Sequence, residues 1–348
     1  MKRLIAILLA AAAILAGAAH ADNPAAHAPT WTQAAVAAAI ERVDTQAELQ
    51  VLFERARAGN DAALLARIEH LRARDDWPAP AREFVLFSFT EALSDLPPGT
   101  VDTRVIERLS AIRPEVRVPH PDDDRLGIVM FNIPAAAAGV ATEWRRQAAS
   151  QRAVALLTRD TAAWIDGFLN GDRAERNGFL DALAAVGEER LRALANAVAP
   201  RLESEAALAT AAARAGILLR DGPLFAQALS GAPPAGLAEL ARQAAGAFGP
   251  VQARQTVAAL AAAAPAPTTA VVLAEWAPLL LQDVGGADFL FELLDDEDLG
   301  LAAALALARN GDEATRARLA MLAAQPDGKQ AQRAAIALGG PLGEREAR

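Results

Sequence analysis

The chain of 348 residues is long enough for one large domain, two ordinary domains or an array of repeats. Its net charge of −9 at pH 7 argues against nucleic-acid binding, and the absence of cysteine excludes a thiol nucleophile, a disulfide and a cysteine-ligated metal. Alanine, leucine and arginine dominate the composition, and these strong helix formers predict an all-α protein.

The first residues have the three parts of a secretory signal peptide. Lys2 and Arg3 form a positive start, residues 4–17 carry no charge, and Ala19-His20-Ala21 is a small-x-small cleavage site. The apolar run is shorter than the roughly 20 residues that a membrane span needs. We therefore predict a signal peptide over residues 1–21, cleavage after Ala21, and a periplasmic or secreted mature protein. The alternative is an uncleaved N-terminal anchor.

The mature chain is predicted to be more acidic than the precursor. Loss of residues 1–21 would remove two of the 34 basic residues and leave 32 against 43 acidic ones, a net charge of −11. Such a chain suits neither nucleic acid nor an anionic membrane surface. The other long uncharged stretch, 256–274, is mostly alanine and is interrupted by Pro265 and Pro267. We therefore expect no stable membrane insertion after cleavage.

Helical periodicity begins at Trp31, after a predicted flexible leader over residues 22–30. Apolar residues spaced by three and four predict a succession of short helices through an N-terminal helical region, residues 31–112. Trp77-Pro78-Ala79-Pro80 is expected to end one of these helices, because proline cannot continue it. The next helix is expected to carry a wide apolar face from Phe84 to Leu93.

The segment 113–134 interrupts the helical pattern. It is polar and rich in proline as far as Asp124, and it becomes apolar from Ile128 to Phe131. About 20 residues without helical periodicity exceed ordinary connection lengths. We predict one long irregular loop here and a candidate domain boundary, with the apolar residues docked on the helices as a short extended segment.

Helical periodicity resumes at 135 and continues as short units that turn signals separate. Near the C-terminal end the sequence repeats itself at an offset of 31 residues, from Asp296 to Asp327. At this offset residues 303–307 correspond to residues 334–338. A helix pair of this length cannot bury its own apolar face, so successive pairs are expected to stack.

These residues resemble HEAT-like helical repeats of the short bacterial kind. The acidic turn 295–298 precedes an alanine-rich helix and a further turn at Gly311-Asp312. The resemblance is clear over 288–343 and fainter from about 172, and the valine–arginine pair that usually follows the acidic turn is absent. It implies an α-solenoid of antiparallel helix pairs over 135–348, with a curved surface that binds a protein partner. It implies no chemistry.

His120, Asp122, Asp123 and Asp124 form the candidate metal cluster. Oxygen-rich loops bind Ca²⁺, and a histidine would add a ligand for Zn²⁺. The run lacks the alternating spacing that wraps a calcium ion, and adjacent acids point in different directions. We therefore interpret it as a solvated turn with capping acids, and we assign no metal, no cofactor and no catalytic residue.

Two other groups of residues invite a chemical interpretation. The acids at 295–298 would form a paired-carboxylate site, but capping of the following helix explains them more simply. His70 is expected to be a partly exposed structural residue on its helix. The sequence contains no G-x-S-x-G, no H-E-x-x-H and no phosphate loop.

The sequence therefore predicts an exported helical-repeat scaffold that binds a protein partner in the periplasm and performs no catalysis. Two alternatives stay open. The first is a hydrolase or lyase with a site near the 113–134 loop, which a deep cleft around His120 with converging aspartates would favour. The second is a carrier of an apolar molecule such as a lipid between helix layers, which a continuous apolar groove would favour.

Overall fold

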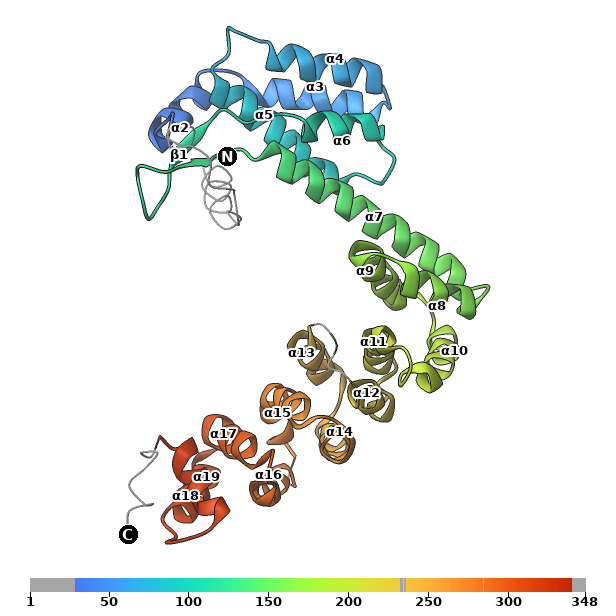
Figure 1. Ribbon diagram of the computed structural model, residues 1–348, viewed down its shortest axis with the longest axis vertical. Coiled ribbons are helices and arrows are strands. Elements are labelled where there is room, and N and C mark those ends of the chain that lie inside the picture. Colours follow the sequence, from blue (N-terminus) through green and yellow to red (C-terminus); the bar gives the residue numbers. More distant parts are fainter. Residues whose placement is uncertain (1–28, 232–233, 235, 284, 340–348) are drawn as a thin grey trace. The chain divides into compact units, whose positions relative to one another are not determined.

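A computed structural model of the chain describes residues 29–231, 234, 236–283 and 285–339. Helices account for most of these residues, and two short strands are the only strands described there, so the predicted all-α class is confirmed (Figure 1). The predicted signal peptide and nearly all of the predicted leader lie outside the described residues. No helix in the described ranges combines the length and apolarity that a membrane crossing requires.

The chain divides into two compact units, one that ends at Ala148 and one that begins at Ala149. The division lies inside one long helix, and the segment 113–134 belongs wholly to the first unit. The elements described in the first unit and the helix that ends it are α2 Gln33–Glu41, α3 Thr45–Arg57, α4 Asp61–Arg72, α5 Ala79–Ala92, the 3₁₀ turn η3 Leu93–Asp95, α6 Thr103–Ser110, β1 Arg117–Pro119, β2 Gly127–Val129 and α7 Ile133–Leu157.

Helix α5 is the centre of the first unit, because α2, α3 and α4 all pack against it. Its buried Phe89 contacts Phe53 of α3 with ring centroids 5.3 Å apart. The prolines at 78 and 80 begin α5 rather than ending the preceding helix, which stops at Arg72. The sequence prediction is wrong at this point because a proline in the first helical turn lacks only an N–H that the helix leaves unpaired anyway.

A short β-hairpin replaces the irregular loop that the sequence predicts over 113–134. Strands β1 and β2 pair antiparallel, with Val118 opposite Ile128. The expected docking of the apolar residues is confirmed, because Met130 and Phe131 pack with Val116, Val118 and Val36 of α2 in a small buried cluster. Each strand has only three residues, so alternation along the sequence is too short to reveal it beside the prolines.

The second unit contains short helices joined by tight turns. Those described are α8 Thr161–Asn170, α9 Arg173–Ala182, η4 Leu183–Ala185, α10 Glu188–Val198, η5 Ala199–Arg201, η6 Ala206–Leu208, α11 Ala209–Leu219, α12 Gly222–Leu229, α13 Leu237–Ala247, α14 Pro250–Ala263, α15 Ala266–Leu280, α16 Gly286–Glu292, η7 Leu293–Asp295, α17 Gly300–Asn310, α18 Glu313–Ala323 and α19 Lys329–Ala337. Pro265 caps α15 and Pro267 lies in its first turn, so these prolines separate α14 from α15 as predicted.

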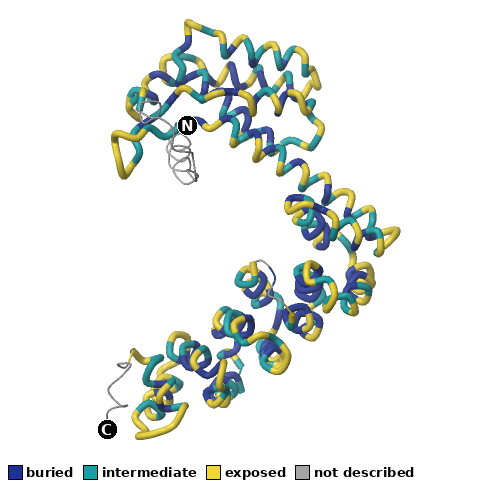
Figure 2. The backbone as a smooth tube through the Cα atoms, viewed as in Figure 1, coloured by how far each residue is buried: buried dark blue, intermediate teal, exposed yellow. Residues whose placement is uncertain are grey.

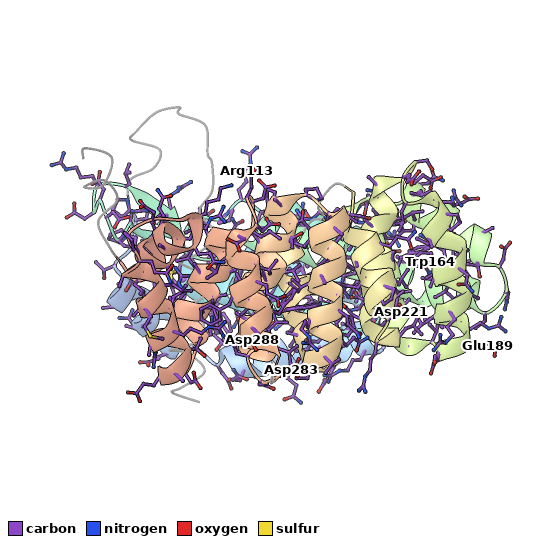
Figure 3. The ribbon with its side chains drawn as sticks, turned by 90° about the horizontal axis from the view of Figure 1, so that it is seen from below. Arg113, Trp164, Glu189, Asp221, Asp283 and Asp288 are labelled. Carbon is purple, nitrogen blue, oxygen red and sulfur yellow. The ribbon has the colours of Figure 1, made fainter. Side chains whose placement is uncertain are left out.

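From α11 onward the helices of the second unit lie in two rows. In the odd row, α11, α13, α15, α17 and α19 each contact the next, and in the even row α12, α14 and α16 do the same. Contacts such as α11 with α12 and α14 with α15 join the rows. Figure 3 shows these helices side by side, and Figure 2 shows their buried residues where they face one another. The unit therefore has one continuous apolar core between the rows.

Two tryptophans anchor this core. Trp276 of α15 has ring centroids 5.6 Å from Phe225 and 5.5 Å from Phe248, and its indole N–H donates to the carbonyl of Ala241 in α13 at 2.7 Å. Trp164 of α8 stacks on Phe168 at 5.4 Å. Its buried indole N–H has no acceptor among the residues that the structure describes. The two anchors therefore differ in hydrogen bonding but not in burial.

The sequence offset of 31 residues relates α16 and α17 to α18 and α19. The helix pairs correspond, but their burial does not: Leu290 of α16 is 0% exposed, whereas the corresponding Met321 of α18 is 67% exposed. Helix α16 packs against both α14 and α17, whereas α18 packs against α17 and α19 and contacts α16 through Arg318, and its Met321 side chain stays exposed. The outer face of α18 is therefore left open.

This difference gives a matched pair of substitutions. We expect Leu290→Ala to lower the free energy of unfolding by about 2–3 kcal/mol, because it opens a cavity in a closed core. Met321→Ala at the corresponding repeat position is expected to change it by less than about 0.5 kcal/mol, because exposed side chains lose little on truncation. Urea denaturation of the two variants measures both values, and equal losses would contradict the difference in burial between these two repeat positions.

Candidate functional site

The sequence candidates His120, Asp122, Asp123 and Asp124 lie in the turn between β1 and β2. His120 Nδ1 accepts the N–H of Asp122 at 3.1 Å and lies 3.9 Å from Asp122 Oδ2. The Asp122 side chain is 91% exposed, and Asp123 Oδ1 accepts the N–H of Arg125 at 3.0 Å. Within the described ranges, no three His, Asp or Glu side chains are grouped so that they could hold a metal ion. The aspartates therefore do not converge on His120.

Glu83 of α5 anchors the hairpin, and sequence reasoning missed it. Its carboxylate accepts the N–H of Glu115 at 2.6 Å and the N–H of Val116 at 3.3 Å, although the residue is only 7% exposed. Burial raises the pKa of Glu83 to about 7, against the opposing effect of these two backbone hydrogen bonds. The sequence does contain one signal for it. Glu83 lies three residues after Pro80 and seven before Thr90, on the buried face of α5.

The N-terminal end of the described chain also holds the hairpin. The backbone N–H groups of Thr30 and Trp31 both donate to the carbonyl of Arg117 at 3.0 Å, and the hydroxyl of Thr30 accepts the N–H of Arg117 at 3.1 Å. Thr30, which the sequence places in a flexible leader, is therefore fixed against β1. The hairpin is bound on one side by α5 and on the other by this segment.

A second buried carboxylate, Glu48, belongs to a structural ion network. Glu48 of α3 accepts two hydrogen bonds from the guanidinium of Arg67 in α4, and Arg74 Nη1 lies 3.7 Å from it. Arg74 also pairs with Asp76 at 2.9 Å and lies over the ring of Trp77 at 4.4 Å. The network links α3, α4 and the turn before α5, while His70 is exposed on α4.

The acidic turn before α17 does not form a carboxylate pair. Asp296 Oδ1 accepts the N–H groups of Asp298 at 3.0 Å and Leu299 at 2.8 Å. Glu297 pairs with Lys329 at 2.7 Å, and this contact lowers the pKa of Glu297. Asp295 accepts a hydrogen bond from Gln330 at 2.6 Å, so Asp295, Asp296 and Glu297 each have a separate partner, and Asp296 stabilises the turn before α17 rather than capping the helix itself.

Three of the acids labelled in Figure 3, Asp221, Asp283 and Asp288, are similarly engaged. Asp221 accepts the N–H of Leu224 at 3.0 Å and so caps α12. Asp283 lies 3.3 Å from Arg254, and Asp288 lies 2.5 Å from Arg318. These carboxylates stabilise helix ends and join neighbouring helices.

An exposed apolar surface lies on two neighbouring helices of the odd row. On α15 it comprises Val271, Ala274 and Pro278, and on α17 it comprises Leu301 and Leu305; we call these five residues the odd-row patch. Ala274, Pro278 and Leu301 are exposed, and Val271 and Leu305 are half-buried. Their spacing by three and four residues places each set on one helix face, opposite the face that packs into the core.

A charged cluster lies next to the odd-row patch. Arg242 of α13 lies 3.0 Å from Glu239 and 3.9 Å from Glu275 of α15. These three side chains are partly to largely exposed, and Glu275 directly follows Ala274 of the patch in the chain. The odd row therefore has an apolar centre with a charged margin, which is the usual anatomy of a protein-binding surface.

A separate groove of about 470 Å³ lies at the other end of the second unit. Residues of η4, α10 and the end of α11 form it, and they are Leu183, Ala184, Val186, Glu188, Leu191, Leu218, Leu219 and Arg220. Six of these eight residues are aliphatic, and Glu188 and Arg220 are the two charged ones. The groove shares no residue with the odd-row patch.

Comparison with known proteins gives no further guide, because no family model, no curated protein and no solved structure matches the chain. The geometry of the described residues therefore carries the functional argument.

Proposed function

We propose that this chain is an exported helical-repeat scaffold whose odd row binds a protein partner, without catalysis and without a cofactor. The odd-row patch is the observation that carries the proposal. Exposed apolar side chains on two helices that contact each other favour an interaction site, particularly beside charged residues. The patch lies on two successive odd-row helices, so a single partner segment can contact both.

The proposal includes a HEAT-like α-solenoid over the second unit. Two lines of evidence support it: the sequence offset of 31 residues coincides with the step from α16–α17 to α18–α19, and each odd-row helix contacts the next odd-row helix. Repeat proteins of this kind stack helix pairs that contact only their neighbours and use the resulting extended surface for binding. The odd row supplies such a surface.

The proposed partner presents an amphipathic helix with basic residues beside its apolar face. Apolar side chains spaced by three and four would pack on the patch as a helix packs into a groove. The half-buried acid Glu275 lies beside Ala274, the exposed acid Glu239 lies on the neighbouring α13, and the net charge of −9 favours encounter with a basic surface. Basic residues on the partner would therefore face this margin.

Site-specific photo-crosslinking tests the proposal. A photoreactive amino acid at position 274 or 301 is expected to give one discrete adduct with an envelope protein in cells. The same amino acid at Gln255, which is exposed on α14 of the even row, is the control and is expected to give none. Loss of the adduct at position 301 on Ala274→Glu would place the contact on the patch. Absence of any adduct, or equal adducts at 255 and 274, would contradict the proposal.

Export is a distinct part of the proposal and has its own measurement. Cleavage after Ala21 predicts a mature N-terminus at Asp22, which N-terminal sequencing of protein from the periplasmic fraction would identify. Protein that stays in the cytoplasm with Met1 intact would contradict export. The partner of the odd-row patch would then be a cytoplasmic protein.

A further inference from the structure

The turn between β1 and β2 contains the longest run of exposed residues in the described part of the first unit. All six residues from 121 to 126 are exposed, and Figure 2 shows the turn standing out from the helices. The side chain of Asp122 is 91% exposed, and Leu126 is 46% exposed. Arg125 is exposed between them, so the residues on both sides of the Arg125–Leu126 peptide bond reach solvent.

Arg125 is the basic residue that a protease can reach most directly. Endoproteases usually cut folded proteins at exposed polar turns, because a helix cannot adopt the extended conformation that a protease cleft binds without first unfolding. The described chain has one other run of six exposed residues, 324–329, which ends at Lys329. The bond after Lys329 lies in the first turn of α19, and its ammonium pairs with Glu297 at 2.7 Å. The other exposed arginines of the described chain lie in helices or in shorter exposed runs.

The strand before the turn is fixed to the N-terminal helices. Glu83 of α5 accepts the N–H of Glu115 at 2.6 Å. The N–H of Thr30, just before α2, donates to the carbonyl of Arg117 at 3.0 Å. These contacts all lie within the part of the chain that ends at Arg125, so a cut after Arg125 leaves them in place.

The chain after the turn has its own contacts with the same helices. The ring centroid of Phe131 lies 5.9 Å from that of Phe84 in α5. The indole N–H of Trp144 in α7 donates to the carbonyls of Leu93 at 3.1 Å and Leu96 at 3.0 Å. The two products of a cut after Arg125 would therefore stay together through buried contacts. Three further buried residues of α7 join the core of the N-terminal helices: Ile133, Ala137 and Val140.

We propose that the turn between β1 and β2 is a processing site for an arginine-specific endoprotease, which cuts after Arg125 and leaves a two-chain protein that stays folded. Hydrolysis consumes one water: its hydroxyl joins the carbonyl carbon of Arg125, and its proton joins the nitrogen of Leu126 as the peptide bond breaks. The exposed guanidinium of Arg125 supplies the charge that the acidic specificity pocket of such a protease binds. The site shares no residue with the odd-row patch and does not depend on the partner proposed for it.

Brief digestion of the purified, folded chain with trypsin tests the proposal. Mass spectrometry is expected to identify the first cut between residues 29 and 339 as the one that yields a C-terminus at Arg125 and an N-terminus at Leu126. The two products are expected to elute together on size exclusion and to separate in concentrated urea. A lysine-specific endoprotease is the matched control, because Lys329 ends the other exposed run, and it is expected to cut at least tenfold more slowly.

Two variants locate the cut. Arg125→Gln is expected to lower the rate of the first cut at least tenfold with an unchanged thermal midpoint, because truncation of an exposed side chain costs little stability. Arg113→Gln replaces an exposed arginine that precedes Pro114 on the approach to the same hairpin, and it is expected to be cut after Arg125 at the wild-type rate.

Three results would overturn the proposal. One is a first cut at another position between residues 29 and 339, or no cut in this range before the chain is digested as a whole. Another is an unchanged rate of the first cut in Arg125→Gln. The third is separation of the two products without urea, which would show that the buried contacts on either side of the turn do not hold them together.

Discussion

Trp276→Ala is expected to lower the free energy of unfolding of the second unit by about 4 kcal/mol. The side chain is fully buried, and its removal empties the space between Phe225 of α12 and Phe248 at the end of α13. Truncation of a buried aromatic residue costs about 3–5 kcal/mol, because the surrounding structure collapses only in part. Urea denaturation followed by circular dichroism measures the loss.

Phenylalanine at the two buried tryptophans separates the hydrogen bond from the packing. Trp276→Phe removes the N–H that donates to Ala241, whereas Trp164→Phe removes a buried N–H that has no acceptor in the described chain. Both variants lose similar volume, but only the first loses a hydrogen bond, worth about 1 kcal/mol. We therefore expect Trp276→Phe to be the more destabilising by about that amount. A Trp164→Phe variant that is as destabilised as Trp276→Phe, or more so, would contradict this assignment.

The stability of the first unit is expected to fall as the pH rises from about 4.5 to about 7, because of Glu83. The folded chain holds the proton on this buried carboxyl up to a pKa of about 7, whereas an unfolded chain releases it near 4.5. In this interval the folded state binds more protons than the unfolded state. The stabilising contribution of Glu83 is therefore fully present below about pH 4.5 and is lost as the pH rises through about 7. The difference between the two pKa values of Glu83 corresponds to about 3 kcal/mol of unfolding free energy.

Glu83→Gln is expected to remove this dependence while keeping an oxygen that accepts the N–H of Glu115. Thermal unfolding of the wild type and the variant between pH 4.5 and pH 8 gives the comparison, and the two midpoints are expected to diverge as the pH rises. Glu175→Gln is the control: the hydrogen bonds that Glu175 receives from Asp172 and Arg152 lower the pKa of Glu175, so its contribution is lost only as the pH falls below about 4.5. Parallel curves for the wild type and Glu83→Gln would refute the role of Glu83.

The helices were predictable because their signals are local. The apolar residues spaced by three and four at Leu64, Ile68 and Leu71 lie within α4, and Pro265 and Pro267 mark the start of α15. Each signal depends on residues within one or two helical turns. The proline rule failed at residues 77–80 because the same residue type ends one helix and begins another, and only the side chains packed around it distinguish the two cases.

The hairpin and the candidate sites were not predictable because they depend on contacts between distant residues. Arg117 is paired both with Val129 and with Thr30, 87 positions earlier in the sequence. Glu83 receives its hydrogen bonds from residues 32 and 33 positions away. The left-handed backbone at Arg220 has no sequence signal, since glycine is the expected residue there. Sequence patterns describe which residues are buried, but not which distant residue meets them.

The two-row arrangement also bears on how the second unit gains and loses its structure. Each odd-row helix touches partners that are at most two helices away along the chain, so assembly requires no distant segments to find each other. Among the described helices of this unit, opening is expected to be cheapest near α18, where Met321 is exposed. Amide hydrogens are therefore expected to exchange faster in α18, which carries the exposed Met321, than in α15, whose side chains Trp276 and Leu280 are fully buried.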